Sequence, residues 1–451
     1  MTIAAIGLLA MAATAMSAEQ SPPSRVATRA DSLFRDLIQR ERFQGSVVIA
    51  HGSQVLFEAG FGFADRERQV PFTPDTPTDA ASIAKTFTAA GVLLLASEGK
   101  LDLEAPVRAV LPEFPHAETR VRHLLSLSAG LPDYEWFDAR APQGQPRSNA
   151  GHLALIADAG IAPRFAPGTR FAYDNAAYDV AAMVIERASS TTYAKFVAER
   201  FLDPLGIEAF IRPARFADWS GVRTRGYRRT ADSLADHDAY DLEGSHGAAN
   251  LYASARSLQR WAAGFRQPMG PECHAAAVSR ARLDDGRTTG ISMGSWYVDA
   301  ARSRRYYTGS HNGFYSVAYA DDASGLSLAW VANDAPPAWL HSGLTRALIE
   351  IAEGREPAAL VPPAPQEVAD PSGVYEVPSV GAVRVRRVAK ATQVECAGVT
   401  YDAFRIERGV HYVPGLDAYL RFAGDPKRGI TLSWDSVFSH APVIRRTTPS
   451  D

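Results

Sequence analysis

The spacing of apolar and polar residues changes along the chain and predicts its elements. Near the start, apolar residues at helical spacing predict a helix over 31–40, and the apolar runs 46–50 and 55–57 predict two strands joined by a turn. From about 101 to 280 the spacing is mostly helical, with long loops. Strand-like runs then return, and the expected elements are strands over Ser295–Val298, Phe314–Tyr319 and Leu326–Ala332 and a helix over Leu340–Ala352.

This order places strands at both ends of a long region and helices in its middle. Two of the expected middle helices cover 177–188 and 193–202. A sheet built in this order must pair its first and last strands. The predicted fold of residues 30–353 is therefore α+β, with an antiparallel sheet flanked by helices and a helical insertion.

The pattern changes again after this region. A proline-rich linker is expected over 354–368, and about eight short strand-like runs follow it. Short strands at regular spacing are typical of a small β-barrel, which we expect over 369–447. The clearest of these runs are Val383–Val385, Thr392–Glu395, Tyr419–Phe422 and Ile430–Trp434.

The first residues resemble an export signal followed by a tether. Residues 3–16 are apolar and end in small residues, which predicts a signal peptide over 1–18 and a tether over 19–29. No Lys or Arg precedes Arg25, so the usual basic start is missing, and an uncleaved anchor or a disordered tail stays open. We expect a periplasmic or secreted protein.

Composition narrows the possible functions. A length of 451 residues suggests about two or three domains. The net charge is −3 and no run of basic residues stands out, so nucleic acid is not an expected partner. Two cysteines, Cys273 and Cys396, form one bridge or remain two inert thiols. No segment after the signal is apolar enough to suggest a transmembrane span.

The strongest candidate for chemistry is Ser82, three residues before Lys85. One helical turn separates the two, so their side chains lie on one face. A serine hydroxyl needs a neighbouring base, and a lysine can be that base when burial or nearby cations keep it partly neutral. Only five of the 47 basic residues are lysines, and an arginine stays protonated. A surface lysine beside an incidental serine is the alternative.

Two further motifs offer partners for this pair. Tyr173-Asp174-Asn175 is the only Tyr-x-Asn in the chain; its phenol could relay a proton and its amide could bind a substrate or Lys85. A loop aromatic that packs on a helix is the alternative. His311 and Gly313 form a His-x-Gly just before an expected strand, whose edge could pair with a substrate.

The His-x-Gly motif is weak alone. His341-Ser342-Gly343 has the same spacing, but it precedes a helix, so His311 is preferred.

Together the three motifs resemble the serine β-lactamase and penicillin-recognising DD-peptidase superfamily, in the branch with class C β-lactamases, D-aminopeptidases and esterases. Their order and spacing fit that family, and the likeness covers about residues 30–352. Other segments that match the family are Leu124–Pro132, Pro204–Ile207 and Gly247–Leu251.

The resemblance implies a covalent mechanism without a cofactor. Ser82 would attack a carbonyl to form an acyl-enzyme, with Lys85 and Tyr173 sharing the proton transfers. An oxyanion hole would combine the Ser82 N–H with one from the late strand near Tyr315. The substrate-binding residues would be Asn175, His311, Gly313, Tyr315 and His246.

The substrate is a small molecule or peptide whose class stays open. His311 stands where β-lactamases have Lys, and Phe314 follows where many DD-peptidases keep a hydroxyl for the substrate carboxylate, unless Arg287 or Arg305 supplies that contact. We expect D-amino-acid peptides, amides or related esters. A β-lactamase, a broad esterase, a transacylase and a non-turning-over penicillin-binding sensor are the alternatives. The loops around Trp136, His246 and Phe314 would decide between them.

Two competing sites carry less weight. Gly290-Ile291-Ser292-Met293-Gly294 fits Gly-x-Ser-x-Gly, but it follows a polar loop instead of a strand. A crowd of acidic and histidine residues could suggest a metal site, but its spacing matches no standard one and predicts a solvated loop. Its members are Asp232, Asp236, His237, Asp238, Asp241 and His246.

Overall fold

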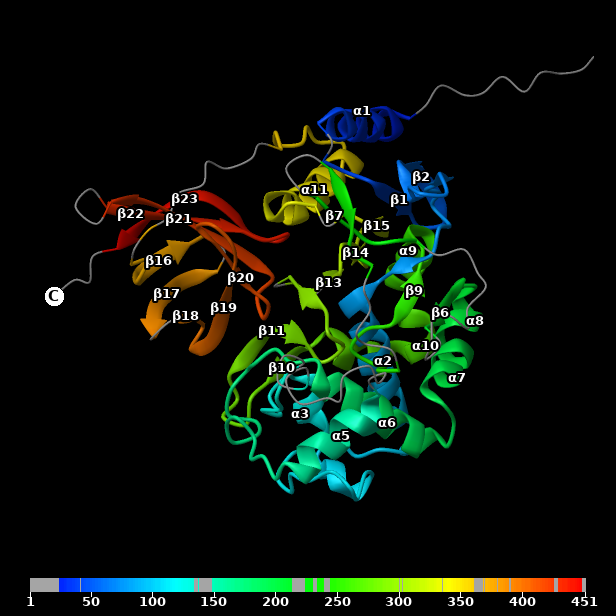
Figure 1. Cartoon of the computed structure of the whole chain (residues 1–451), viewed down its shortest axis with the longest axis vertical. Coiled ribbons are helices and arrows are strands. Elements are labelled where there is room, and N and C mark those ends of the chain that lie inside the picture. Colours follow the sequence, from blue (N-terminus) through cyan, green and yellow to red (C-terminus); the bar gives the residue numbers. More distant parts are fainter. Residues whose placement is uncertain are drawn as a thin grey trace, which may run out of the picture.

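The computed structural model describes residues 24–40, 42–133, 137, 148–212, 224–229, 233–238, 244–299, 301, 303–334, 336–360, 368, 370–378, 380–388, 391–425 and 429–447. These residues form a mixed helix-and-sheet body and, beside it, a β-barrel made by the C-terminal part of the chain (Figure 1). The expected signal over 1–18 and Trp136 lie outside the described residues.

The body is built on one eight-stranded sheet in the order β10-β11-β12-β13-β14-β15-β1-β2. The first and last strands of the region pair as expected, with Val48 of β1 opposite Ala329 of β15. The bounds are β1 Gly45–His51, β2 Gln54–Phe61, β10 Arg280–Arg282, β11 Thr288–Ser292, β12 Tyr297–Val298, β13 Arg304–His311, β14 Phe314–Asp321 and β15 Leu326–Ala332.

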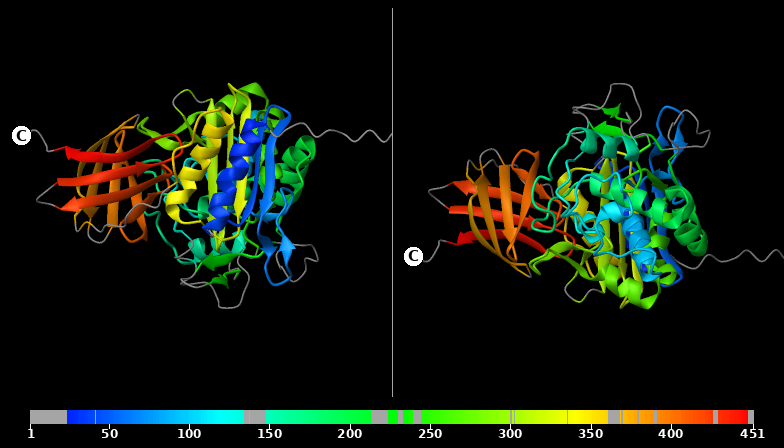
Figure 2. Two further views of the ribbon diagram at one scale, coloured as in Figure 1. Left: turned by 90° about the horizontal axis from the view of Figure 1, so that it is seen from above. Right: turned by 90° about the horizontal axis from the view of Figure 1, so that it is seen from below.

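Helices cover both faces of the sheet, which explains why every residue of β14 and β15 is buried. On one face α1 (Arg25–Gln39) and α11 (Ala338–Ala352) lie side by side (Figure 2). On the other lie α2 (Ala84–Ser97) and α9 (Ala255–Gly264), which belong to the helical middle region. The prediction of an α+β fold with a helical insertion is confirmed.

The remaining body elements are short or belong to the helical side. The helices are α3 Val121–Leu125, α5 Asn149–Asp158, α6 Ala176–Ser189, α7 Tyr193–Val197, α8 Asp203–Leu205 and α10 Arg266–Val278, with 3-10 turns Ala81–Ile83 and Val107–Ala109 and a π-turn Ala198–Leu202. The small strands are β3 Phe63–Asp65, β4 Val70–Pro71, β5 Thr78–Asp79, β6 Ala209–Ile211, β7 Tyr227–Arg229, β8 Leu234–Asp236 and β9 Leu251–Ala253.

Two expectations about local structure were wrong. The tether expected over 19–29 is too long, because α1 begins at Arg25, where the Ser24 hydroxyl accepts the N–H of Ala27 and caps the helix. The strand expected over 295–298 contains only Tyr297 and Val298, since Ser295 has a positive φ of 63° that interrupts extended backbone.

The C-terminal part is a closed barrel of eight antiparallel strands in chain order, as expected. It closes where Val374 of β16 pairs with Thr447 of β23. Its strands are β16 Gly373–Val377, β17 Gly381–Val388, β18 Ala391–Cys396, β19 Val399–Glu407, β20 Val410–Val413, β21 Ala418–Asp425, β22 Gly429–Asp435 and β23 His440–Thr447.

The barrel contacts the body through one turn and through residues of its strands. The turn Pro414–Asp417 enters the body beside β11 and β12, where the Tyr297 hydroxyl donates to the Pro414 carbonyl. A Cβ on Gly290 would overlap the Gly415 carbonyl oxygen, so backbone lies directly on backbone there. Arg346 of α11 also donates to Asp435 at 2.5 Å.

Both cysteines are buried and unpaired, which excludes a bridge between them in this structure. Within the described ranges, every helix is too short or too polar to cross a lipid bilayer.

Candidate active site

Ser82 lies in a tight 3-10 turn, Ala81–Ile83, that leads directly into α2. The Asp79 carboxylate accepts the Ala81 N–H at 2.8 Å and fixes the start of this turn. Ala81 has a positive φ of 46°, a strained conformation for a residue with a side chain. The backbone thus holds Ser82 at the N-terminal end of a buried helix.

Lys85 is fully buried beneath Ser82. Its ammonium nitrogen donates to three oxygens: Ser82 Oγ at 3.1 Å, Asn175 Oδ1 at 2.7 Å and the Ala248 carbonyl at 3.0 Å. All three acceptors are neutral groups, so these contacts orient the amine without supplying a counter-charge. One of its protons points at the hydroxyl that would be activated.

Tyr173 completes the contacts of the nucleophile. Its hydroxyl lies 2.9 Å from Ser82 Oγ, and Lys85 Nζ lies 5.1 Å from the centre of its ring. Asn175, the last residue of the motif, is held by Asp133, whose carboxylate accepts from its backbone N–H and its side-chain amide, each at 3.0 Å. The sequence motifs Ser-x-x-Lys and Tyr-x-Asn therefore meet in space.

Asp174 is a buried acid next to this group that sequence reasoning did not single out. Its Oδ1 accepts the Ala177 N–H at 2.7 Å at the start of α6. Burial, together with the negative charge of Asp133, raises the pKa of Asp174 to about 8. Asp174 is therefore protonated at neutral pH, and the carboxyl adds little negative charge beside Lys85.

Strand β13 passes close to the nucleophile at Gly309. A Cβ at this position would overlap the Ala80 carbonyl oxygen and lie 3.0 Å from the Ser82 nitrogen. Ser316, the partner of Gly309 on β14, donates to the same carbonyl at 2.8 Å. Only glycine permits this approach of the strand to the turn.

The open edge of β13 lies beyond Tyr306, because β12 pairs only with Arg305 and Tyr306. The turn Asn312-Gly313 has two positive φ values, 39° and 87°, as a two-residue hairpin turn requires.

In such a hairpin the flanking residues His311 and Phe314 form a hydrogen-bonded pair. Alternate residues on β13, Ser310 and Thr308, then direct their backbone groups away from β14. Among the described strands none pairs with that edge.

The predicted roles on β14 need correction. Tyr315 pairs with Ser310 on one side and Ala332 on the other, so it lies inside the sheet and its N–H cannot reach the open edge. Its ring is buried against His341. A Cβ on Gly313 would meet the Tyr227 backbone instead of Ser82. The Ser310 N–H is the better candidate for the role expected near Tyr315, because it lies on the open edge next to Gly309.

His311 and His246 have different surroundings. His311 ends β13, and its Nδ1 lies 3.1 Å from Asp79 Oδ2, at the start of the Ser82 turn. The ring of His246 stacks on Tyr193, and the backbone N–H of His246 donates to Asn149 Oδ1 at 2.8 Å. In the described part of the chain His246 makes no contact with Ser82, Lys85 or Tyr173, so a place in the cleft is not supported.

The two arginines that could bind a substrate carboxylate both have other partners. Arg305 is buried and pairs with Asp322 at 2.6 Å. Arg287 donates to Asp285 and, at 2.6 Å, to the Gly398 carbonyl of the barrel. Phe314 is fully buried.

The competing sites do not gain support. Ser292 lies within β11 and is buried, and its Oγ accepts the Trp296 N–H at 3.0 Å, so it is not an exposed nucleophile. Asp236 pairs with Arg225, while Asp232 and Asp241 lie outside the described residues. Among the residues that the structure describes, no group of three suitable side chains could hold a metal ion.

The barrel supplies a neighbour that the sequence did not predict. Asp417, at the end of the inserted turn, accepts the Tyr412 hydroxyl at 2.9 Å and lies 3.5 Å from Thr308 Oγ1 on β13. Burial raises the pKa of Asp417 to about 6. No local pattern could reveal this contact, because it depends on how the barrel sits on the body.

Comparison with known proteins agrees with this geometry. A family model described as Beta-lactamase matches residues 30–353. A penicillin-binding protein from Bacillus subtilis (strain 168) is 32% identical over 211 residues, which cover 46% of this chain. The alignment spans 44% of that relative's length, so the chain matches less than half of it.

Solved structures share the fold. The crystal structure of SurE is 22% identical, with a TM-score of 0.62 over 94% of this chain and 100% of that one. The D-amino acid amidase from Ochrobactrum anthropi SV3, complexed with L-phenylalanine amide, is 20% identical, with a TM-score of 0.57 over 69% of this chain and 91% of that one. The long match to SurE includes the barrel region.

Proposed function

The chain belongs to the Beta-lactamase family, and on that premise we propose that it is a serine hydrolase that cleaves amide or ester bonds through an acyl-enzyme on Ser82. One observation carries the proposal: the Ser82 hydroxyl lies within hydrogen-bond distance of both Lys85 Nζ and Tyr173 Oη. A serine hydroxyl in contact with an amine and a phenol, each of which can accept its proton, has the geometry that acyl transfer requires.

In the first step Ser82 Oγ attacks the substrate carbonyl carbon while its proton passes to Lys85 or Tyr173. The carbonyl oxygen becomes an oxyanion, which the backbone N–H groups of Ser82 and Ser310 are positioned to receive. Each such donor contributes about 3 kcal/mol to transition-state stability. The proton then moves to the leaving amine or alcohol, the bond to it breaks, and an ester on Ser82 remains.

In the second step water attacks that ester. The same Lys85–Tyr173 pair takes a proton from the water and returns one to Ser82 Oγ, which releases the acid and restores the enzyme. Asn175 holds Lys85 through its Oδ1 during both steps and is itself fixed by Asp133. An amine in place of water would give a transacylase with the same residues.

For the substrate we propose D-amino-acid amides, peptides or related esters. Arg287 and Arg305 are both engaged, which disfavours substrates that must be held by a free carboxylate. The amidase whose fold the chain shares is named for D-amino acids, and this supports the same class here. A β-lactamase or broad esterase is the second candidate. We keep export to the periplasm or medium as part of the proposal.

A substrate panel tests the proposal. Purified protein and its Ser82→Ala variant are given p-nitrophenyl esters, D- and L-alanine p-nitroanilides and a chromogenic cephalosporin. We expect turnover of esters and of the D-anilide by the wild type alone. Equal rates in the variant would contradict the mechanism. Labelling by a fluorescent penicillin without any turnover would favour the sensor alternative.

A further inference from the structure

A second cavity, of about 670 Å³, lies between the body and the barrel. Tyr306 of β13 lines it, whereas Gly309 of the same strand faces Ser82. Side chains alternate along a strand, so an odd separation of three residues puts these two on opposite faces. The cavity is therefore separate from the candidate active site.

The walls of this cavity combine aromatic and aliphatic side chains from both parts of the chain. The body contributes Tyr297 and Tyr306, and the barrel contributes Leu416, Trp434 and Phe438. The rings of Tyr306 and Phe438 meet edge to face, with centroids 4.8 Å apart, and hold the two parts together. The volume matches that of small-molecule sites, which occur preferentially between domains.

Four arginines line the cavity, and three of them pair with carboxylates. Arg304 pairs with Glu353, Arg346 with Asp435, and Arg355 with Glu350 and Glu353.

The fourth, Arg280, donates to the Val298 carbonyl at 3.2 Å. Within the described ranges no carboxylate lies at ion-pair distance from its guanidinium. Asp299 also lines the cavity, where its Oδ1 accepts the Arg304 backbone N–H at 3.3 Å, and its negative charge disfavours a multiply charged ligand. One guanidinium without a carboxylate partner therefore suits a monoanion.

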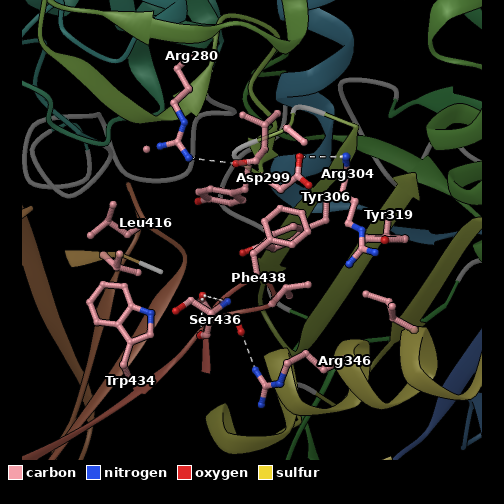
Figure 3. A pocket seen from close by; sticks show the side chains of 18 of the residues that line it. Arg280, Asp299, Arg304, Tyr306, Tyr319, Arg346, Leu416, Trp434, Ser436 and Phe438 are labelled. Carbon is pink, nitrogen blue, oxygen red and sulfur yellow. Dashed lines mark hydrogen bonds between the residues drawn. The ribbon is translucent and has the colours of Figure 1, made fainter. Parts of the chain in front are cut away.

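A second polar group that lines the cavity lacks an acceptor. Trp434 is 2% exposed, and its Nε1–H has no hydrogen-bond partner in the part of the chain that the structure describes. Figure 3 shows Arg280 at the top of the view and Trp434 at the lower left, with Leu416 between them. A buried donor without an acceptor is costly unless a ligand supplies one.

We propose that this cavity binds a small organic monoanion, a carboxylate on an apolar body. The carboxylate would accept two bonds from the Arg280 guanidinium, whose planar fork suits that group. The apolar body would pack on Leu416 and Tyr297. Aromatic and fatty carboxylates share this chemistry, and the experiment distinguishes them.

The fluorescent anion anilinonaphthalene sulfonate serves as the probe. Energy transfer from tryptophan reports its binding, and naphthoate and decanoate are used to displace it. We expect saturable binding to wild type and Ser82→Ala alike, with displacement by naphthoate, by decanoate or by both. The uncharged analogue naphthalenemethanol should displace it poorly. Displacement by that alcohol as readily as by naphthoate would overturn the proposal.

Arg280→Gln provides the decisive variant, and Arg282→Gln its matched control. Arg282 lies on the same strand, bonds the Gly286 carbonyl and does not line this cavity. We expect the dissociation constant for naphthoate to rise about tenfold or more in Arg280→Gln and to stay unchanged in the control.

Thermal unfolding checks that each variant folds; if Arg280→Gln does not, Arg280→Lys takes its place, with a smaller rise expected. Unchanged affinity in a folded Arg280 variant would contradict the assignment. Failure of this test leaves the Ser82 chemistry untouched, because the two sites share no residue.

Discussion

At the scale of single residues, the position of Lys85 decides whether Ser82 can act as a nucleophile. Its amine is enclosed by Ser82, Asn175 and the Ala248 carbonyl, none of which carries a charge. A neutral amine held in this position could take the proton of the Ser82 hydroxyl. The scarcity of lysine in the sequence pointed to this residue before its surroundings were known.

Replacement of Lys85 by arginine tests this point. The guanidinium keeps a positive charge but stays protonated, so it cannot act as a base. We expect kcat/KM for a p-nitrophenyl ester to fall about 10²- to 10⁴-fold in Lys85→Arg. Lys100→Arg is the matched control, since Lys100 lies on the surface and pairs with Glu98 at 2.9 Å. Similar activity in both variants would exclude Lys85 as the base.

Asp174 gives a prediction about stability and pH. Burial raises its pKa in the folded protein to about 8, far above the value in an unfolded chain. Its contribution is therefore complete at low pH and is lost as pH rises towards 8. The free energy of unfolding of wild type, relative to Asp174→Asn, should fall by about 1 kcal/mol per pH unit between pH 5 and 8.

Urea unfolding of both proteins at pH 5, 7 and 9 measures this difference. The wild-type disadvantage should level off above pH 8. A difference that does not vary with pH would show that Asp174 is already ionised in the folded protein.

At the scale of elements, the hairpin of β13 and β14 decides which groups face a substrate. The sequence placed the substrate contact on the strand that begins at Phe314, whereas the preceding strand β13 lies beside Ser82. It placed the contact too late, because a His-x-Gly spacing does not reveal where a hairpin turns. Positive φ at Asn312 and Gly313 fixes the register, and Gly309 and Ser310 then reach the nucleophile.

The turn Pro414–Asp417 is the element that connects the barrel to this hairpin. Asp417 lies 3.5 Å from Thr308, whose backbone faces the open edge. We expect Asp417→Asn to lower kcat/KM about tenfold through a shift of β13. Burial raises the pKa of Asp417 to about 6, so the carboxyl is ionised above that pH. The loss in Asp417→Asn should therefore be larger above pH 6.

A pH profile of kcat/KM for the two proteins checks this. Asp402→Asn is the control, since Asp402 also joins barrel and body, through Arg170 at 2.7 Å, without a contact to β13. An equal loss in both variants, or a loss independent of pH, would mean that Asp417 only fastens the barrel.

At the scale of the whole molecule, the two parts of the fold could be predicted from local runs of strand-like residues. Runs of buried strand residues at both ends of one region required the first and last strands to pair, as β1 and β15 do. Eight short strands after the linker predicted the barrel. The position of the barrel did not follow, because the contacts of Tyr297 with Pro414 and of Arg346 with Asp435 join residues about 90 or more positions apart.

The candidate site was predictable only where its contacts are local in the sequence or belong to a family motif. Ser82 and Lys85 are one helical turn apart, so their contact is local and could be inferred. Tyr173 was found through its motif and the family resemblance. The contacts of the half-buried Asp133, the buried Asp174 and the barrel residue Asp417 depend on tertiary packing and were missed.

Trapping of the acyl-enzyme tests the central claim most directly. The protein is mixed with an excess of a p-nitrophenyl ester, quenched in acid within seconds, and measured by intact mass and peptide mapping. We expect a mass increase equal to one acyl group, located on Ser82, in wild type and none in Ser82→Ala. An acyl group on another residue, or the same increase in Ser82→Ala, would contradict it.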